Sequence, residues 1–235
     1  MSEPLNGKTC VVTGASSGIG RAVAQALAAQ GARVVGYARR FEQERLLFLP
    51  GPGEVTELAL DITDEAQVSA RFAELPTIDV LVNAAGLGLF APLVETELEA
   101  LRALLAVHVT GTFACCREAA MRMQATLCGH IVTIGSIAST RYLPGCGAYA
   151  VAKSAQAAMS RALVEELRAH QVRVTHLLLG AVDTSLWQSA GVDEASLDRS
   201  RMLQPADVAE VVVEALTRPG LSLETMTILP PGGVL

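Results

Sequence analysis

The chain has 235 residues, of which 51% are hydrophobic and 18% charged, and its formal net charge at pH 7 is −6. This composition predicts a globular chain with room for one sizeable domain or two small ones, and it excludes a disordered chain. The acidic charge argues against nucleic acid as a partner, because phosphate binding needs a basic surface. Residues 1–8 are polar and no run approaches about 18 apolar residues, so neither a secretory signal nor a membrane-spanning helix is expected.

Cysteine usage favours a reducing compartment. The five cysteines are odd in number and contain no Cys-x-x-Cys pair. Buried thiols are therefore favoured over disulfides or a metal site, and we expect a cytoplasmic protein that binds no metal.

Apolar runs typical of strands alternate with helical patterns along nearly the whole chain. Residues 80–82 and 131–132 lack polar alternation, as do strands buried on both faces of a parallel sheet. The alternation predicts an α/β fold, a Rossmann-type doubly wound, mainly parallel sheet of about seven strands with helices on both faces. Without a linker or repeat, residues 1–235 are expected to form one domain. The expected strands are Thr9–Thr13, Arg33–Tyr37, Val55–Leu60, Asp79–Asn83, His130–Gly135, Val172–Leu179 and Thr225–Leu229; the expected helices are Ile19–Gln30, Glu65–Ala73, Leu98–Ala125, Tyr149–His170 and Pro205–Arg218.

Three glycines follow the first expected strand and open the first helix. Gly14, Gly18 and Gly20 carry no Cβ, so backbone N–H groups in this turn can approach a ligand closely. The helix start adds unpaired N–H groups and a partial positive charge, and together these features predict a pyrophosphate site. The same residues fit the Gly-x-Ser-x-Gly turn of α/β-hydrolases, but no earlier strand is present here to supply an oxyanion loop.

Two segments resemble motifs of the short-chain dehydrogenase/reductase family. Thr13-Gly14-x-x-x-Gly18-Ile19-Gly20 resembles the cofactor turn, and Asn83-Ala84-Ala85-Gly86 resembles a second motif at the expected spacing. The resemblance implies a nicotinamide dinucleotide bound at the sheet edge. The resemblance implies that the following residues between positions 14 and 86 bind the dinucleotide: Gly14, Ser16, Ser17, Gly18, Ile19, Gly20, Asp61, Ile62, Asn83, Ala84 and Gly86.

Two arginines follow the second expected strand. An acid at its end would bind the adenosine ribose of NAD, but Ala38 stands there and is followed by Arg39 and Arg40. An arginine can bind a 2′-phosphate through charge-assisted hydrogen bonds, so NADP(H) is preferred over NAD(H). The alternative interpretation is a solvated basic loop.

A serine, a tyrosine and a lysine carry the expected chemistry. Ser136 ends the fifth strand, and Tyr149-x-x-x-Lys153 places a phenol and an ammonium on one helix face. The family resemblance implies that Tyr149 moves a proton and contacts the cofactor, and that Lys153 lowers the pKa of Tyr149 and binds the nicotinamide ribose. It also implies that Ser136 bonds to the substrate oxygen. His108 stands where the family's catalytic tetrad has asparagine, and it is either a member of the proton relay or a buried structural histidine.

The last third of the chain resembles the family less closely. Leu179-Gly180-Ala181-Val182-Asp183-Thr184 resembles a Pro-Gly-x-x-x-Thr motif and implies that Gly180, Val182 and Thr184 hold the nicotinamide carboxamide. Residues 185–204 are expected to form a substrate lid, to which Trp187 belongs.

The whole pattern predicts an NADP(H)-dependent alcohol dehydrogenase or carbonyl reductase. Its substrate is expected to be a small 3-hydroxy or 3-oxo acid, an aldehyde or a ketone. The alternatives are a non-catalytic NADP-binding sensor or scaffold and a longer epimerase-type relative, for which 235 residues leave little room. The alanine-rich helix faces of residues 98–125 and 149–170 favour a homodimer or homotetramer.

Overall fold

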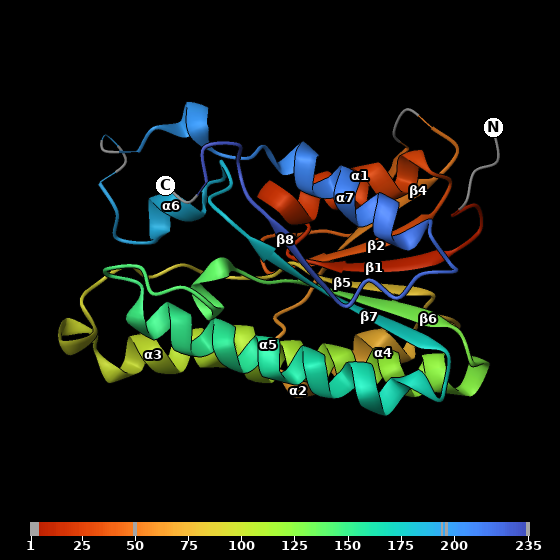
Figure 1. Ribbon diagram of the computed structural model, residues 1–235. Helices are drawn as coiled ribbons and strands as arrows, with labels where there is room; N and C mark the ends of the chain where they lie inside the picture. Colours follow the sequence, from red (N-terminus) through yellow and green to blue (C-terminus); the bar gives the residue numbers. More distant parts are fainter. Residues whose placement is uncertain (1–4, 49–50, 194, 196, 234–235) are drawn as a thin grey trace.

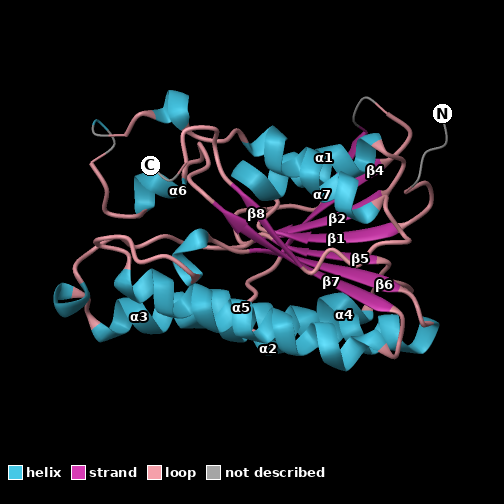
Figure 2. Ribbon diagram, viewed as in Figure 1, coloured by secondary structure: helices cyan, strands magenta, loops and turns pink. Residues whose placement is uncertain are grey.

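The computed structural model describes residues 5–48, 51–193, 195 and 197–233. Its centre is one eight-stranded sheet with the order β3-β4-β2-β1-β5-β6-β7-β8, covered by helices on both faces (Figures 1 and 2). All strand pairs are parallel except β3–β4. The doubly wound fold predicted from the sequence is confirmed. The strands are β1 (Thr9–Thr13), β2 (Arg33–Ala38), β3 (Arg45–Phe48), β4 (Glu54–Ala59), β5 (Val80–Asn83), β6 (Gly129–Ile134), β7 (Val172–Leu179) and β8 (Thr225–Ile228).

Strand β3 is the one strand that the sequence did not predict. It lies antiparallel at the sheet edge, where Arg45 pairs with Glu57 of β4. It is only four residues long, three of them are exposed, and its short apolar run, Leu46–Phe48, is followed closely by the turn residues Gly51, Pro52 and Gly53, so the segment is typical of an irregular loop. Interior strands such as β1 and β5 are buried at every position, which is why their sequences could be recognised.

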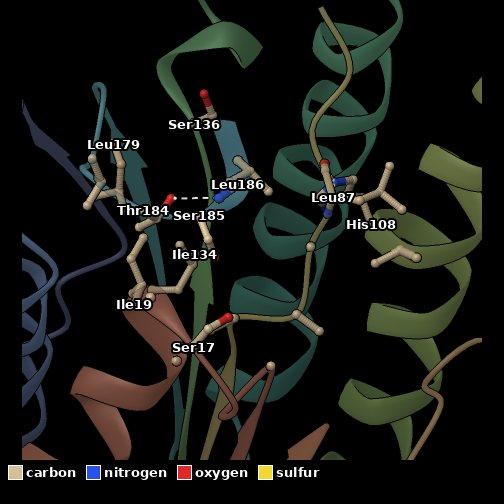
Figure 3. Close-up of a pocket in the computed structure, with 18 of the residues that line it drawn as sticks. Ser17, Ile19, Leu87, His108, Ile134, Ser136, Leu179, Thr184, Ser185 and Leu186 are labelled. Carbon is tan, nitrogen blue, oxygen red and sulfur yellow. Dashed lines mark hydrogen bonds between the residues drawn. The ribbon is translucent and has the colours of Figure 1, made fainter. Parts of the chain in front are cut away.

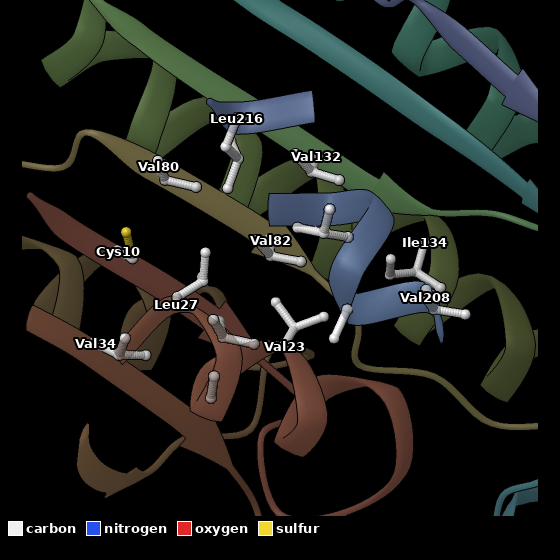
Figure 4. Packing of buried hydrophobic residues seen from close by; sticks show 14 of the residues in the cluster. Cys10, Val23, Leu27, Val34, Val80, Val82, Val132, Ile134, Val208 and Leu216 are labelled. Carbon is white, nitrogen blue, oxygen red and sulfur yellow. The ribbon is translucent and has the colours of Figure 1, made fainter. Parts of the chain in front are cut away.

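The helices form two layers. Helices α1 (Gly18–Ala29) and α7 (Pro205–Leu216) cover one face, and α2 (Glu65–Ala73), α4 (Thr112–Thr126) and α5 (Gly147–Arg168) cover the other (Figure 1). Local sequence sets their ends: Asp64 caps α2 by accepting a hydrogen bond from the Gln67 N–H at 3.0 Å, and Pro205 opens α7. Figure 4 shows the core between α1, α7 and the sheet, where Val23 and Leu27 pack among strand residues such as Val82.

The helix expected over Leu98–Ala125 is interrupted. The structure has α3 (Leu98–Leu105), a π-helical segment η2 (Ala106–Gly111) and then α4. By length and mean hydropathy, 1.3, Leu98–Thr126 is apolar enough to cross a membrane. Here α4 packs against α2, α5 and strands β5, β6 and β7, as a core helix of an α/β domain does.

All five cysteines are free thiols, and four of them are buried. Cys128 is exposed, which corrects the expectation of buried thiols at that position: it lies in the turn between α4 and β6 rather than under a helix.

The strand order reverses at β1 and β5, and the loops after these two strands diverge there. In doubly wound sheets ligands bind at such a reversal, beyond the carboxyl ends of the strands. The Thr13 hydroxyl oxygen ties the two loops together by accepting hydrogen bonds from the N–H groups of Ala84 and Ala85, each at 3.2 Å. The fold therefore places both glycine-containing motifs at one point of the carboxyl edge.

Candidate active site

A cavity of about 700 Å³ runs along the carboxyl edge of the sheet. Figure 3 shows Ser17 and Ile19 of the glycine turn at one end of it and Ser136 and Leu186 at the other. Every site residue expected from the sequence, apart from Asn83, lines this cavity. The lining residues among them are Gly14, Ser16, Ser17, Gly18, Ile19, Gly20, Arg39, Arg40, Asp61, Ile62, Ala84, Gly86, His108, Ser136, Tyr149, Lys153, Gly180, Val182 and Thr184.

The glycine turn forms a cradle of backbone, and a side chain at Gly14 or Gly20 would clash with neighbouring backbone atoms. A Cβ on Gly14 would lie 2.7 Å from the Ala84 carbonyl oxygen, and one on Gly20 would lie 2.3 Å from the Gly14 carbonyl oxygen. Gly14 also has φ +71°, a conformation that disfavours other residues. Glycine at these positions lets the turn pack closely against the loop after β5 and lets the start of α1 pack closely against the turn. The unpaired N–H groups at the helix start fit the pyrophosphate of a dinucleotide.

The N-terminus of α1 opens onto this cradle. Ser17 precedes the helix, makes no side-chain cap, and no acidic residue stands in the first turn. Its hydroxyl oxygen accepts a hydrogen bond from Arg40 Nη2 at 2.8 Å. Arg39 and Arg40 are exposed and line the cavity, so the end next to β2 is cationic. Cationic side chains and free helix N–H groups are what a phosphate-bearing ligand needs.

Asp61 and Asn83 differ in their placement. The Asp61 carboxylate lines the cavity and accepts hydrogen bonds from the Thr63 N–H and hydroxyl, while Asp64 serves as the cap of α2. Asn83 is 3% exposed and its side-chain amide donates toward Cys116 Sγ at 3.2 Å. Asn83 is thus the one expected site residue that does not line the cavity, and its contact with the cofactor stays a prediction.

Ser136, Tyr149 and Lys153 converge from two elements. Ser136 follows β6 and accepts a hydrogen bond from the Ala138 N–H at 3.1 Å, which starts the short helix η3 (Ile137–Ser139). Tyr149 and Lys153 lie one turn apart on α5, with Lys153 Nζ 5.8 Å from the Tyr149 ring centroid. The Lys153 ammonium donates to the Ile134 carbonyl oxygen and to Gln156 Oε1, each at 2.9 Å.

Burial sets the protonation of this pair. It raises the pKa of Tyr149 to about 12, although a hydrogen bond with Ser136 opposes that rise. It lowers the pKa of Lys153 to about 7. Desolvation is the largest influence on the Tyr149 pKa, and the lowering expected from Lys153 together with a nicotinamide ring stays a prediction. The phenol is thus protonated at neutral pH and ready to donate.

His108 occupies the π-helical segment, a type of irregularity frequent at functional sites. Its ring is 1% exposed and stands edge-on to the Tyr149 ring, with 5.6 Å between centroids. Nε2 lies 2.7 Å from the Leu87 carbonyl oxygen, and the buried Nδ1 has no hydrogen-bond partner among the described residues. Burial lowers the pKa of His108 to about 3, so the ring is neutral. In the tautomer with its proton on Nε2, facing the Leu87 carbonyl oxygen, Nδ1 is an acceptor.

Two aromatic residues, Phe90 and Trp187, line the cavity beside Tyr149, and Phe90 had no signal in the sequence. Phe90 stacks on Trp187 with 5.2 Å between centroids and lies 5.8 Å from the Tyr149 ring. Trp187 is fixed because its Nε1 donates to the Val182 carbonyl oxygen at 2.9 Å. Phe90 belongs to no motif and is brought here by the loop after β5, so only the folded chain identifies it.

The loop after β7 holds the remaining residues. Val182 forms a parallel bridge with Leu203, and the Thr184 hydroxyl oxygen accepts from the Leu186 N–H at 3.3 Å (Figure 3). Leu186 begins the short helix α6 (Leu186–Ser189), and η5 (Arg199–Arg201) follows. Two residues of the expected lid, 194 and 196, lie outside the described residues.

Comparison with known proteins gives a consistent family. Residues 8–195 match the model described as short chain dehydrogenase. An uncharacterized oxidoreductase of Mycobacterium tuberculosis is 39% identical over 234 residues, covering 95% of this chain and 91% of the relative. Glycine betaine reductase of Emericella nidulans is 35% identical over 228 residues, but this chain spans only 18% of that relative's length.

Solved structures agree. An alcohol dehydrogenase from the archaeon Thermococcus sibiricus, complexed with 5-hydroxy-NADP, superposes with a TM-score of 0.83 at 27% identity, covering 95% of this chain and 97% of its own. A metagenomic short-chain oxidoreductase in complex with NADP gives a TM-score of 0.79 at 30% identity, covering 97% and 98%. Both similar structures therefore hold NADP or a derivative of it.

Proposed function

Because this chain belongs to the short-chain dehydrogenase family and is an oxidoreductase of that family, we propose that it interconverts the carbonyl and alcohol forms of a small substrate with NADP(H). The observation that carries the proposal is the convergence of Ser136, Tyr149 and Lys153 on the cavity that also holds the glycine cradle. NADP in two similar solved structures supports the choice of cofactor.

The residues that would hold the cofactor divide by chemistry. Helix α1 and its glycine turn offer N–H groups to the pyrophosphate, and Arg39 and Arg40 offer guanidinium groups to a 2′-phosphate. Asp61 offers a carboxylate to the adenine end, and the loop with Val182 and Thr184 offers backbone and hydroxyl groups to the nicotinamide end. When bound, NADP(H) supplies or accepts the hydride.

The protein's own part is to hold the substrate oxygen and to move one proton. The Ser136 hydroxyl donates to the carbonyl oxygen as negative charge develops on it. The Tyr149 phenol, protonated at neutral pH, gives its proton to that oxygen during reduction, and the phenolate takes it back during oxidation. The Lys153 ammonium stabilises the phenolate that forms.

The substrate end of the cavity favours a neutral, apolar carbonyl compound. Its lining beyond Tyr149 is mainly aromatic or aliphatic, with the Cys146 thiol and the Gln188 amide as its polar members, and none of these described lining residues is charged. This narrows the range expected from the sequence toward ketones and aldehydes and away from free 3-oxo acids. The lining residues of this end are Leu87, Phe90, Ile137, Ala138, Leu143, Cys146, Leu186, Trp187 and Gln188.

The decisive experiment is NADPH oxidation across a panel of aryl and alkyl ketones, aldehydes and 3-oxo acids, repeated with Tyr149→Phe. The variant is expected to lose about a hundredfold or more of kcat/KM, as for a positioned proton donor. Tyr142→Phe is the matched control because that side chain is 99% exposed, and it should leave the rate unchanged. Full activity of Tyr149→Phe would contradict the proposal, and NADPH binding without turnover of any substrate would favour a sensor or scaffold instead.

We extend the proposal to assembly and location. Phe113 and Met121 are exposed two turns apart on α4, and Val151 is exposed on α5, which supports a homodimer or homotetramer formed through these helices. Light scattering on wild type and on Phe113→Glu tests this: a dissociated variant is expected, and an unchanged mass would contradict it. Free thiols support a cytoplasmic location.

A further inference from the structure

A buried glutamine connects Lys153 to the π-helical segment. Gln156 lies on α5, one turn beyond Lys153, and is 1% exposed. Its Oε1 accepts from Lys153 Nζ at 2.9 Å, and its Nε2 donates to Thr112 Oγ1 at 3.4 Å. Burying a polar side chain costs folding free energy unless it is hydrogen-bonded, and the two hydrogen bonds of Gln156 offset that cost.

The surrounding donors and acceptors fix which way the amide faces. The Thr112 hydroxyl donates to the Val107 carbonyl oxygen at 3.2 Å, so its oxygen is available as an acceptor for Gln156 Nε2. A flipped amide would point an NH₂ group at the Lys153 ammonium, bringing two donors together. Oε1 therefore faces Nζ, and the amide links α5 to the first residue of α4, directly after η2 with His108.

We propose that Gln156 is a positioning residue for catalysis: its Oε1 holds the Lys153 ammonium in place and in its charged form beside Tyr149. The proposal deepens the function given above and rests on it for its kinetic consequence. Lys153 has two neutral acceptors, the Ile134 carbonyl oxygen and Gln156 Oε1, and no ion-pair partner among the described residues. Half of the protein's hydrogen bonding to this buried cation thus comes from Gln156.

Within the part of the chain that the structure describes, no opposite charge near Lys153 can replace this acceptor. The titratable groups around it are Tyr149 on its own helix, His108 from η2 and His176 from β7, and burial keeps all three uncharged at pH 7. The charged side chains of the packed helices α3 and α4 pair elsewhere: Glu99 with Arg102, Arg117 with Glu65 and Glu118, and Arg122 with Glu118. Loss of the Gln156 acceptor would therefore make the charged form of Lys153 less stable, with no nearby charge to compensate.

The chain allows a direct measurement because it has only two lysines, Lys8 and Lys153. With ¹³C-labelled lysine, an NMR titration of the two side chains reports the pKa of Lys153, and Lys8 serves as an internal reference. In Gln156→Met, which keeps the volume and removes the acceptor, the titration midpoint of Lys153 should fall by about one pH unit. In Gln156→Glu, which adds a carboxylate, the midpoint should rise. The midpoint of Lys8 should not move in either variant.

Thr175→Val is the matched control. Thr175 is also fully buried, and its hydroxyl lies 2.8 Å from His130 Nε2, near the other end of β6 and β7. The control removes a buried hydrogen bond without contacting Lys153 and should leave its midpoint unchanged. An unchanged midpoint in folded Gln156→Met, or the same direction of shift in the Met and Glu variants, would overturn the proposal. If Gln156→Met does not fold, the Glu variant alone decides: a midpoint that does not rise overturns it.

Kinetics separate this proposal from the function on which it rests. Alcohol oxidation needs the Tyr149 phenolate, so weakening the ammonium in Gln156→Met should move the acid limb of the kcat/KM profile to higher pH, which a merely structural loss would not do. Failure of the wild type to turn over any substrate would contradict the proposed function, whereas the lysine titration would still decide the role of Gln156.

Discussion

The two edges of the sheet use the same kinds of residue in opposite environments. At the amino edge, Lys8 is 45% exposed and its Nζ lies 2.8 Å from Asp79 Oδ1, a hydrogen bond that raises the pKa of Lys8. At the carboxyl edge, Lys153 is 4% exposed, has neutral acceptors only, and burial lowers its pKa to about 7. Lys8 belongs to an ion pair that is open to solvent, whereas Lys153 is buried beside the Tyr149 ring and has no charged partner among the described residues. Chemistry is thus concentrated where the strands end.

The largest contrast is expected from removing each lysine. Lys153→Met takes the ammonium away from Tyr149 and should lower kcat/KM for carbonyl reduction by about a hundredfold or more. Lys8→Met removes a partly exposed ion pair far from the cavity, so kcat/KM should stay within about twofold and the free energy of unfolding should change by about 0–1 kcal/mol. Steady-state kinetics and urea unfolding of both variants measure this difference. An equal loss of kcat/KM in the two variants would contradict a special role for Lys153.

The two ends of β2 offer a second contrast. Arg33 begins the strand at the amino edge and donates to the Thr9 hydroxyl at 3.2 Å, and Arg39 follows the strand at the cavity. Arg39→Ala should raise the KM for NADPH by about tenfold to a hundredfold, the loss expected for a charge-assisted hydrogen bond to phosphate, and should leave the KM for NADH nearly unchanged. Arg33→Ala should change neither KM. An equal rise of the KM for NADPH and for NADH in Arg39→Ala would contradict the assignment of Arg39 to the 2′-phosphate.

The smallest contrast is between two buried histidines, His108 and His130, and their effects on stability and turnover at low pH. His108 near the carboxyl edge and His130 near the amino edge both have pKa values lowered to about 3 by burial. The unfolded chain binds protons below pH 6.5 and the folded chain does not, so stability should fall as pH drops from about 6.5 toward 3, by up to about 1.4 kcal/mol per pH unit for each histidine.

Replacing either histidine by asparagine should flatten that dependence equally, measured by urea unfolding at several pH values. Only His108→Asn should alter the pH dependence of turnover, because only His108 contacts the Tyr149 ring. Identical turnover profiles for the two variants would make His108 a structural histidine like His130.

The cofactor half of the site could be predicted from the sequence because it is built from backbone. Gly14 and Gly20 are required by contacts that allow no Cβ, and such requirements leave fixed spacings in a sequence. The same holds for Tyr149 and Lys153, whose spacing alone places them on one face of a helix. The buried strands β1 and β5 were recognisable because both of their faces are covered.

The substrate half could be predicted only in part because it depends on long-range packing. Trp187 was expected in the lid, but its stacking partner Phe90 lies almost a hundred residues away, and the two meet only when the segments after β5 and β7 lie together. Gln156 looks like an ordinary helical residue until α4 and α5 bury it. Asn83 shows the reverse case: its motif was recognised, but the backbone turns its side chain toward Cys116, away from the cavity.

The central claim is tested most directly by following the hydride and the proton together. With NADPH that carries deuterium at both C4 positions of the nicotinamide and a ketone from the panel, the wild type should form an alcohol carrying one deuterium on the former carbonyl carbon. Tyr149→Phe should bind NADPH with similar affinity and form almost none of that product. An alcohol without deuterium, or full label transfer at the wild-type rate in Tyr149→Phe, would contradict the account.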